Sequence, residues 1–104
     1  MRNILQDLPQ RRDEEVFEDI VNEHGIRVER IVSYGQASPA SGWYDQAWNE
    51  WVTVLEGEAV VAFASGEEVR LAAGDHLKIP ARCRHRVKWT HPARPTLWLA
   101  VHYP

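Results

Sequence analysis

Apolar and polar side chains alternate along most of the chain from Ile26 onward. Because successive side chains of a strand point to opposite faces of a sheet, this alternation is typical of strands that bury one face. Turn residues separate the apolar runs at regular intervals. The pattern predicts strands at residues 26–33, 46–55, 59–63, 67–71, 75–79, 82–89 and 96–103. Strands of this length and spacing predict an all-β fold, an antiparallel sandwich or barrel.

The segment before these strands has a different period. Its apolar side chains recur at helical spacing between residues 13 and 24, at Val16, Phe17, Ile20 and Val21. Acidic residues crowd the first turn, and Gly25 follows as a natural stop. We therefore predict a short amphipathic helix over residues 13–24, after an arm at residues 1–12 that lacks periodicity. The chain is predicted to be one domain, in which an N-terminal segment, 1–25, precedes a barrel, 26–104.

The strand within the stretch Gly42–Gly57 carries a carboxylate among apolar residues. One face of this strand bears Gln46, Trp48, Glu50, Val52 and Val54. A carboxylate on an inward, apolar face is unfavourable unless it is protonated, paired with a charge or bound to a metal. Glu50 is therefore the first candidate site residue.

The strand at residues 82–89 separates its side chains by chemistry. One face carries Cys83, His85, Val87 and Trp89, and the other carries Arg82, Arg84, Arg86 and Lys88. We predict that His85 points inward. The basic face is predicted to be a solvated surface that pairs with acidic residues on neighbouring strands, at Glu56, Glu58, Glu67 and Glu68.

In two other predicted strands, apolar and polar side chains are not separated onto opposite faces. At residues 26–33, apolar and charged side chains share both faces, which an edge position in the sheet or a contact with a second copy would explain. The strand at residues 96–103 is apolar on both faces and includes His102, which lies either in the cavity or at the barrel rim. Together with five Trp in 104 residues, these strands leave apolar surface that a monomer of this size hardly covers. We expect a homodimer.

Composition excludes several classes of function. A net charge of −3 gives no overall electrostatic reason to bind nucleic acid or an anionic membrane, so neither partner is expected. The single cysteine, Cys83, has no internal disulfide partner, and no signal peptide or membrane span is evident. A cytoplasmic protein is the simplest expectation. The sequence also lacks a nucleophile with an adjacent base and a Gly-rich phosphate loop.

Two motifs resemble those of the cupin superfamily. The first cupin motif has the form G-x5-H-x-H-(x3 or x4)-E-x6-G, and Glu50 followed by Gly57 matches its second half. The second has the form G-x5-P-x-G-x2-H-x3-N, and Gly74, Pro80 and His85 match it. The paired histidines are replaced by Tyr44 and Gln46, or by Trp43 and Asp45 at the longer spacing. Arg82 and Trp89 replace the Gly and the Asn of the second motif.

The resemblance implies a cupin-type antiparallel β-barrel, also described as a double-stranded β-helix or jelly roll, with the short helix before it. Glu50, His85 and Gln46 are then candidate metal ligands, with Asp45 and His102 as further candidates. This mixed oxygen and nitrogen set suits zinc, iron, manganese or nickel. The alternative is a metal-free pocket in which Glu50 and His85 hydrogen-bond or form an ion pair. No organic cofactor is expected.

Two functions remain open at this stage. One is an enzyme that acts on a small organic substrate in the barrel, either a metal-dependent oxygenase or an isomerase. In the metal-free version Glu50, His85 and Tyr44 are the catalytic candidates, with His85 and Tyr44 handling protons. The other is a non-catalytic module that binds or senses a small-molecule ligand. The fold alone does not separate them, because cupins host many activities.

Overall fold

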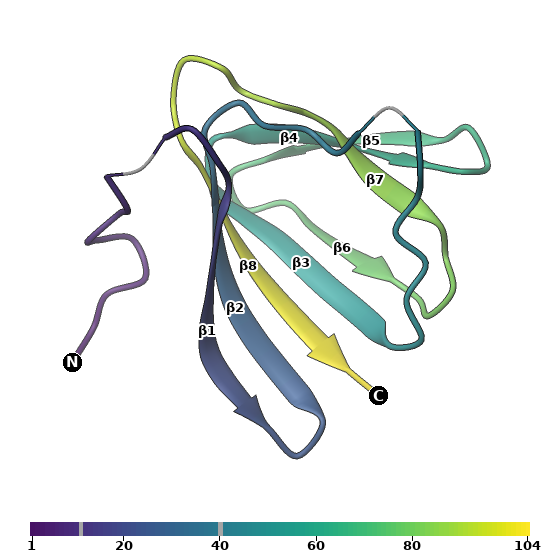
Figure 1. Cartoon of the computed structure of the whole chain (residues 1–104), viewed down its shortest axis with the longest axis horizontal. Helices are drawn as coiled ribbons and strands as arrows, with labels where there is room; N and C mark the ends of the chain where they lie inside the picture. The colour runs from purple at the N-terminus through teal and green to yellow at the C-terminus, as the bar shows by residue number, and fades with distance from the viewer. Residues whose placement is uncertain (11, 40) are drawn as a thin grey trace.

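The computed structural model describes residues 1–10, 12–39 and 41–104. They form an all-β, antiparallel fold with two sheets, as the sequence predicts (Figure 1). The strands are β1 (Val16–Glu23), β2 (Ile26–Ser33), β3 (Asn49–Glu56), β4 (Glu58–Phe63), β5 (Glu68–Ala72), β6 (His76–Ile79), β7 (His85–Thr90) and β8 (Thr96–Tyr103). The larger sheet has the order β1-β2-β8-β3-β6, and the smaller has the order β5-β4-β7.

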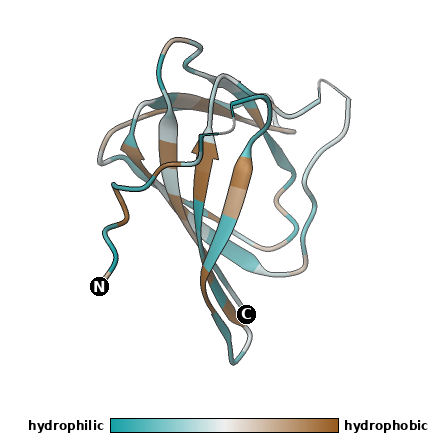
Figure 2. Cartoon of the chain, turned by 60° about the vertical axis from the view of Figure 1, so that its left-hand side comes forward, coloured by the Kyte–Doolittle hydropathy of each residue, from teal (hydrophilic) through white to brown (hydrophobic). Residues whose placement is uncertain are grey.

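The hydrophobic core lies between the two sheets. Brown and teal segments alternate along the strands in Figure 2, as expected where one strand face is buried. The buried cluster draws on strands of both sheets and consists of Val52, Val54, Ala59, Val61, Leu71, Ile79, Trp98 and Ala100. None of the described residues forms a helix long and apolar enough to cross a membrane.

The predicted helix at residues 13–24 is wrong, because this segment contains strand β1. β1 pairs antiparallel with β2, and the register runs from Val16 opposite Val32 to Glu23 opposite Ile26. The two-residue loop between them, His24 and Gly25, has positive φ at both positions, at 55° and 76°. Paired positive φ values are typical of a type I′ hairpin turn. A helix of this length is marginal by itself, whereas the strand gains a row of hydrogen bonds to β2.

Of the two explanations for the mixed faces of residues 26–33, the edge position is wrong. β2 lies inside the larger sheet, between β1 and β8, and β1 forms the edge. Charged side chains occur on both faces of β2 because both faces are partly covered. Glu29 is 7% exposed and Arg30 is 7% exposed, although they point to opposite sides of the sheet.

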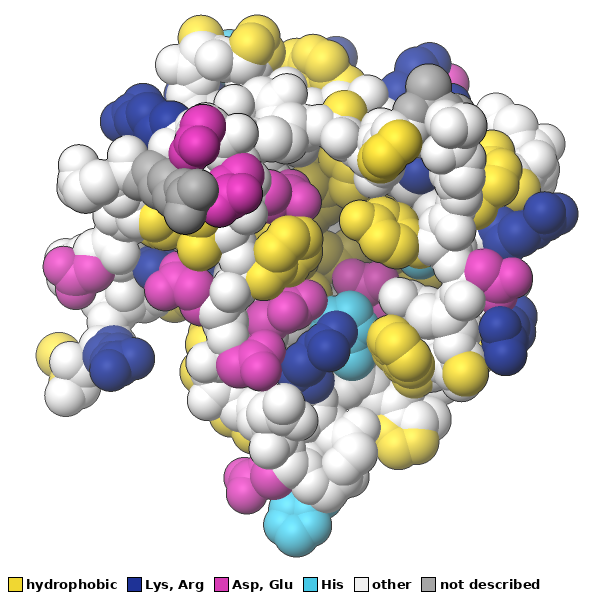
Figure 3. Space-filling model, viewed as in Figure 1, with side chains coloured by type: hydrophobic (Ala, Val, Ile, Leu, Met, Phe, Trp, Pro, Cys, Tyr) yellow, Lys and Arg dark blue, Asp and Glu magenta, His cyan; other side chains and the backbone are white. Residues whose placement is uncertain are grey.

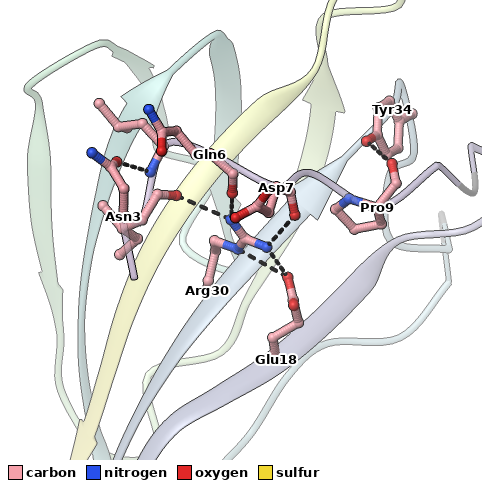
Figure 4. Close-up of polar contacts among 9 residues, drawn as sticks. Asn3, Gln6, Asp7, Pro9, Glu18, Arg30 and Tyr34 are labelled. Atoms are coloured by element: carbon pink, nitrogen blue, oxygen red, sulfur yellow. Dashed lines mark hydrogen bonds and ion pairs between the residues drawn. The ribbon is translucent and has the colours of Figure 1, made fainter. Parts of the chain in front are cut away.

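The N-terminal arm covers the outer face of β2. Arg30 donates hydrogen bonds to the backbone carbonyls of Ile4, Gln6 and Asp7, at distances of 3.2, 2.7 and 3.1 Å (Figure 4). The same guanidinium donates to the carboxylate of Glu18 at 2.6 and 2.9 Å. A buried guanidinium needs such acceptors, so the N-terminal arm is attached to the sheet through its backbone.

The turn between β3 and β4 carries the chain from the larger sheet to the smaller one. Gly57 has a φ of 94° and lies against the start of β8. A methyl group at this position would lie 2.5 Å from the hydroxyl oxygen of Thr96 and 2.7 Å from the carbonyl oxygen of Pro95. Both the backbone conformation and the close approach therefore require glycine here.

We predict that Gly57→Ala destabilises the protein by about 3 kcal/mol, because strain at positive φ adds to overpacking against Thr96. Gly66→Ala is the matched control. Gly66 also has a positive φ, of 99°, but nothing lies within 4 Å of the added methyl group. The control should lose only about 1 kcal/mol. Urea unfolding of both variants measures the difference, and equal losses would show that the contact with Thr96 has no effect.

Candidate functional site

A row of polar side chains crosses the inner face of the larger sheet. Arg27 on β2 is paired with His102 on β8, which is paired with Glu50 on β3, which in turn is paired with Ile79 on β6. Directly paired residues of neighbouring strands share one face. The next row along contains Glu29, so charged and titratable groups gather at one end of this face.

These side chains line a cavity of about 810 Å³ between the sheets. The space-filling view shows a hollow near the centre of the molecule that acidic and hydrophobic side chains border (Figure 3). Its apolar wall consists of Ile31, Val52, Val61, Ile79, Val87 and Trp98. Aromatic side chains also line it, and four of them are between 39% and 55% exposed, namely Phe17, Trp43, Tyr44 and Trp48. A mostly apolar cavity with a few polar groups is typical of a small-molecule site.

Glu50 and His85 meet across the cavity. Glu50 Oε1 lies 3.6 Å from His85 Nε2, and the two side chains are 12% and 6% exposed. Gln46 Nε2 donates a hydrogen bond to the same oxygen at 3.0 Å. Burial alone raises the pKa of Glu50, but the interactions with His85 and Gln46 outweigh it and hold the pKa below its ordinary value. Glu50 is therefore ionised inside the cavity at neutral pH.

His85 is held from its other side by the backbone. Its Nδ1 lies 2.9 Å from the carbonyl oxygen of Cys83 and carries the proton of that hydrogen bond, which leaves Nε2 directed at Glu50. Burial lowers the pKa of His85, but the carboxylate of Glu50 and the Cys83 carbonyl together raise it above its ordinary value. The raised pKa of His85 and the lowered pKa of Glu50 both favour the charged form of the pair, an imidazolium beside a carboxylate.

Tyr44 and Asp45 line the same cavity. Backbone hydrogen bonds join Tyr44 and His85 in both directions, at 2.8 and 3.2 Å. They bring the two rings to a centroid distance of 5.6 Å. Asp45 accepts a hydrogen bond from Arg82 at 3.2 Å, and this pair is largely exposed. Of the two, only Tyr44 is next to the Glu50–His85 pair.

His102 has both ring nitrogens in use. Trp48 Nε1 donates to His102 Nδ1 at 2.9 Å, and His102 Nε2 lies 2.9 Å from Glu29 Oε1. Because an indole nitrogen is only a donor, Nδ1 must be the acceptor and Nε2 must carry the proton given to Glu29. His102 therefore fixes the position of Trp48 beside the cavity and has no free lone pair for a metal.

The predicted metal ligands are only partly brought together. A carboxylate only accepts hydrogen bonds, so Gln46 presents its nitrogen to Glu50 and turns its oxygen away. Glu50 and His85 are then the two strong metal-ligand candidates that lie close together, because Asp45 is paired with Arg82. Within the described part of the chain, no group of three or more His, Cys, Asp or Glu side chains is arranged to hold a metal ion. This donor set does not fit a resident zinc, iron, manganese or nickel ion.

Sequence reasoning missed three charged residues of the cavity, Glu15, Arg27 and Glu29. Glu15 hydrogen-bonds to Ser33, and burial together with the charge of Glu29 raises its pKa above the ordinary value. Arg27 and Glu29 lie on the same strand face as Ile31. This alternation along the strand is the sequence signal that could have placed them in the cavity. The signal is weak because charged and apolar side chains share both faces of residues 26–33.

One prediction about the basic face of residues 82–89 is confirmed in part. Lys88 pairs with Glu68 across the smaller sheet at 2.6 Å. Arg86 instead lies over the ring of Trp43, with its guanidinium carbon 5.1 Å from the ring centroid. Trp89 departs from the expected face, because a register shift in β4 places it opposite Val60 while Val87 is opposite Val61.

Comparison with known proteins agrees with this fold. The model of the cupin domain family matches residues 31–102. A crystal structure from Ralstonia eutropha JMP134, described as a proposed mannose-6-phosphate isomerase, has 41% sequence identity and a TM-score of 0.94, over 99% of this chain and 96% of that one. A cupin superfamily protein from Desulfitobacterium hafniense DCB-2 has 15% identity and a TM-score of 0.77, over 92% of this chain and 83% of that one. A search of curated proteins finds no match.

The two sheets and the largely apolar cavity between them define a small antiparallel β-barrel. The chain belongs to the cupin family. Cupins commonly bind small molecules, and many hold a divalent metal, so the incomplete donor set here is a departure within the family.

The Glu50–His85 pair should make stability depend on pH. His85, with its raised pKa, contributes stability below its ordinary value of 6.5 and loses it as pH rises through the folded value. Glu50, with its lowered pKa, contributes above its ordinary value of 4.5 and loses it as pH falls. The window of full contribution is therefore 4.5 to 6.5.

We predict that wild-type protein exceeds His85→Gln in unfolding free energy most strongly near the middle of that window. The difference should be smaller at about pH 8.5, because His85 has then lost its proton in the unfolded chain and loses it in the folded chain as pH rises, so that its pairing with Glu50 contributes less. Urea titrations of both proteins at the two pH values measure it. A difference that stays constant would mean that the two side chains do not interact.

Proposed function

We propose that this cupin binds a small organic molecule in its cavity and carries out acid–base chemistry of the isomerase type on it, without a resident metal. One observation supports this above all others: a carboxylate and an imidazole ring, only 12% and 6% exposed, face each other at 3.6 Å in the cavity wall. An acid and a base held together in a largely apolar cavity are what proton transfer to and from carbon requires.

The roles follow from the protonation states. Glu50, ionised, takes the proton from a carbon next to a carbonyl group. His85 gives its Nε2 proton to the carbonyl oxygen, so that an enediol or enol forms and no net charge is added. From the enediol, Glu50 gives its proton to the former carbonyl carbon, and the hydroxyl group on the first carbon returns a proton to His85 Nε2 as it becomes the new carbonyl. The isomerisation is then complete and the pair regains its starting state. Tyr44 lies close enough to His85 to contact the same oxygen.

The related structure from Ralstonia eutropha supports an isomerase, since its description names an isomerase of mannose 6-phosphate. The cavity of this chain is lined by four carboxylates, Glu15, Glu29, Asp45 and Glu50, against two arginines and His85. Such a lining repels a doubly charged phosphate. We therefore infer related chemistry, on a substrate with less negative charge.

The test is deuterium exchange in heavy water, followed by proton NMR, with mannose 6-phosphate and phenylpyruvate as probes. Wild-type protein should exchange the carbon-bound proton next to the carbonyl of phenylpyruvate faster than buffer does. Glu50→Gln and His85→Gln should each lower the rate about 100-fold, because each removes one partner of the proton transfer. Glu68→Gln, on an exposed carboxylate of the smaller sheet, is the control and should leave the rate unchanged.

Metal dependence is tested on the same samples. Protein treated with EDTA should exchange at the untreated rate, and elemental analysis should find clearly less than one metal ion per chain. Loss of exchange after chelation, with recovery on adding one metal, would contradict the metal-free mechanism. Binding of a probe without any exchange would instead favour a non-catalytic ligand-binding or sensor module. If neither probe binds, the cavity is not a site for such molecules.

We also propose that two copies associate through the edge of the larger sheet. β1 is the edge strand, and its apolar side chains Phe17 and Ile20 are 55% and 53% exposed. An exposed apolar edge strand is a natural surface for pairing. Light scattering at micromolar concentration should give a dimer mass, and Ile20→Lys should shift it to the monomer. A wild-type monomer under these conditions would contradict the proposal.

A further inference from the structure

The polar groups of the cavity differ in whether another group of the protein forms a hydrogen bond with them. Each carboxylate has a donor: Gln46 for Glu50, His102 for Glu29, Ser33 for Glu15 and Arg82 for Asp45. A ligand therefore meets acceptors that are already engaged. The exception is a donor, the guanidinium of Arg27.

Arg27 Nε is buried and has no hydrogen-bond partner, whereas the Arg27 side chain as a whole is 39% exposed, so other parts of it are accessible to a ligand. The nearest carboxylate oxygen, Glu29 Oε2, is 3.8 Å away, too far for a hydrogen bond. The other oxygen of Glu29 lies 2.9 Å from His102 Nε2. A buried donor without an acceptor is unfavourable, and native proteins leave few of them. An acceptor from outside the chain would remove this penalty.

Arg27 is also well placed relative to the proposed reacting groups. It lies on the same row of the sheet as Glu50, with one strand, β8, between β2 and β3. Neighbouring strands lie about 4.8 Å apart, so roughly 10 Å separates the two backbones. The guanidinium lines the cavity on the β2 side, whereas the Glu50–His85 pair faces it from β3 and β7. A small molecule can therefore contact both ends at once.

From this geometry we infer that Arg27 binds a carboxylate of the ligand, so that the substrate class is a small organic acid with an apolar body. The inference rests on the proposed function of the cavity. The guanidinium would donate to the carboxylate while the apolar wall holds the body of the molecule. A carboxylate fits better than a phosphate, because Glu29 already offsets part of the charge of Arg27 and a single charge meets less repulsion from the other acids.

The test compares three probes of one shape: benzoate, benzamide and phenyl phosphate. Dissociation constants come from the change in tryptophan fluorescence, and amide NMR shifts locate each probe in the cavity. Wild-type protein should bind benzoate about 10-fold more tightly than benzamide, because only the anion gains the charge-assisted hydrogen bonds. Phenyl phosphate should bind more weakly than benzoate.

Two variants isolate Arg27. Arg27→Gln should remove the preference for benzoate and leave benzamide binding unchanged, since the neutral probe does not depend on the charge. Arg27→Lys keeps the charge without the Nε donor and should retain only part of the preference. Arg70→Gln is the matched control, because that guanidinium lies outside the cavity lining and pairs with Glu58, and it should keep the full preference. Far-ultraviolet circular dichroism checks that each variant folds.

The possible results separate this inference from the proposed function. Equal binding of benzoate and benzamide to wild-type protein would overturn the role of Arg27 while leaving the cavity as a small-molecule site. A preference that survives in Arg27→Gln would have the same meaning. Tighter binding of phenyl phosphate than of benzoate would overturn the choice of a carboxylate. No binding of any probe in the cavity would overturn both proposals.

Discussion

The structure depends on how it accommodates one buried carboxylate. Glu50 extends from the larger sheet, and its positive partner, His85, comes from the smaller sheet, so the pair joins the two layers across the cavity. Ionised groups are tolerated in such a place only when each offsets the charge of the other and the remaining atoms are hydrogen-bonded. Gln46 and the carbonyl of Cys83 provide those bonds.

The same principle shapes the rest of the cavity wall. His102 is locked between an indole donor and a carboxylate acceptor, which makes it a positioning group rather than a ligand. Arg27 is the group for which the chain does not complete the pattern. The difference between satisfied and unsatisfied groups separates residues that hold the cavity in shape from those available to a ligand. In a family with many activities, this distinction is more informative than the fold.

The N-terminal segment shows where local pattern and tertiary pairing disagree. The spacing of Val16, Phe17, Ile20 and Val21 matches a helix, yet the chain forms an edge strand. The His24–Gly25 turn and the open edge of β2 decide the outcome, because they offer a hydrogen-bonded partner that an isolated helix lacks. The outer face of β2 is likewise covered through tertiary contacts. Arg30 donates hydrogen bonds to backbone carbonyls of the arm, which lies more than twenty residues earlier in the chain.

The sequence by itself determined the strand positions from Ile26 onward, the glycine turn at Gly57 and the inward direction of Glu50 and His85. These features follow from side-chain parity and from backbone conformation, which are local properties. Only the tertiary structure decided which partner each polar group receives. His102 meets Trp48 from 54 residues away and Glu29 from 73 residues away, and no local pattern encodes such distances. Whether a group binds a ligand or supports the wall is therefore set by the packing of the two sheets.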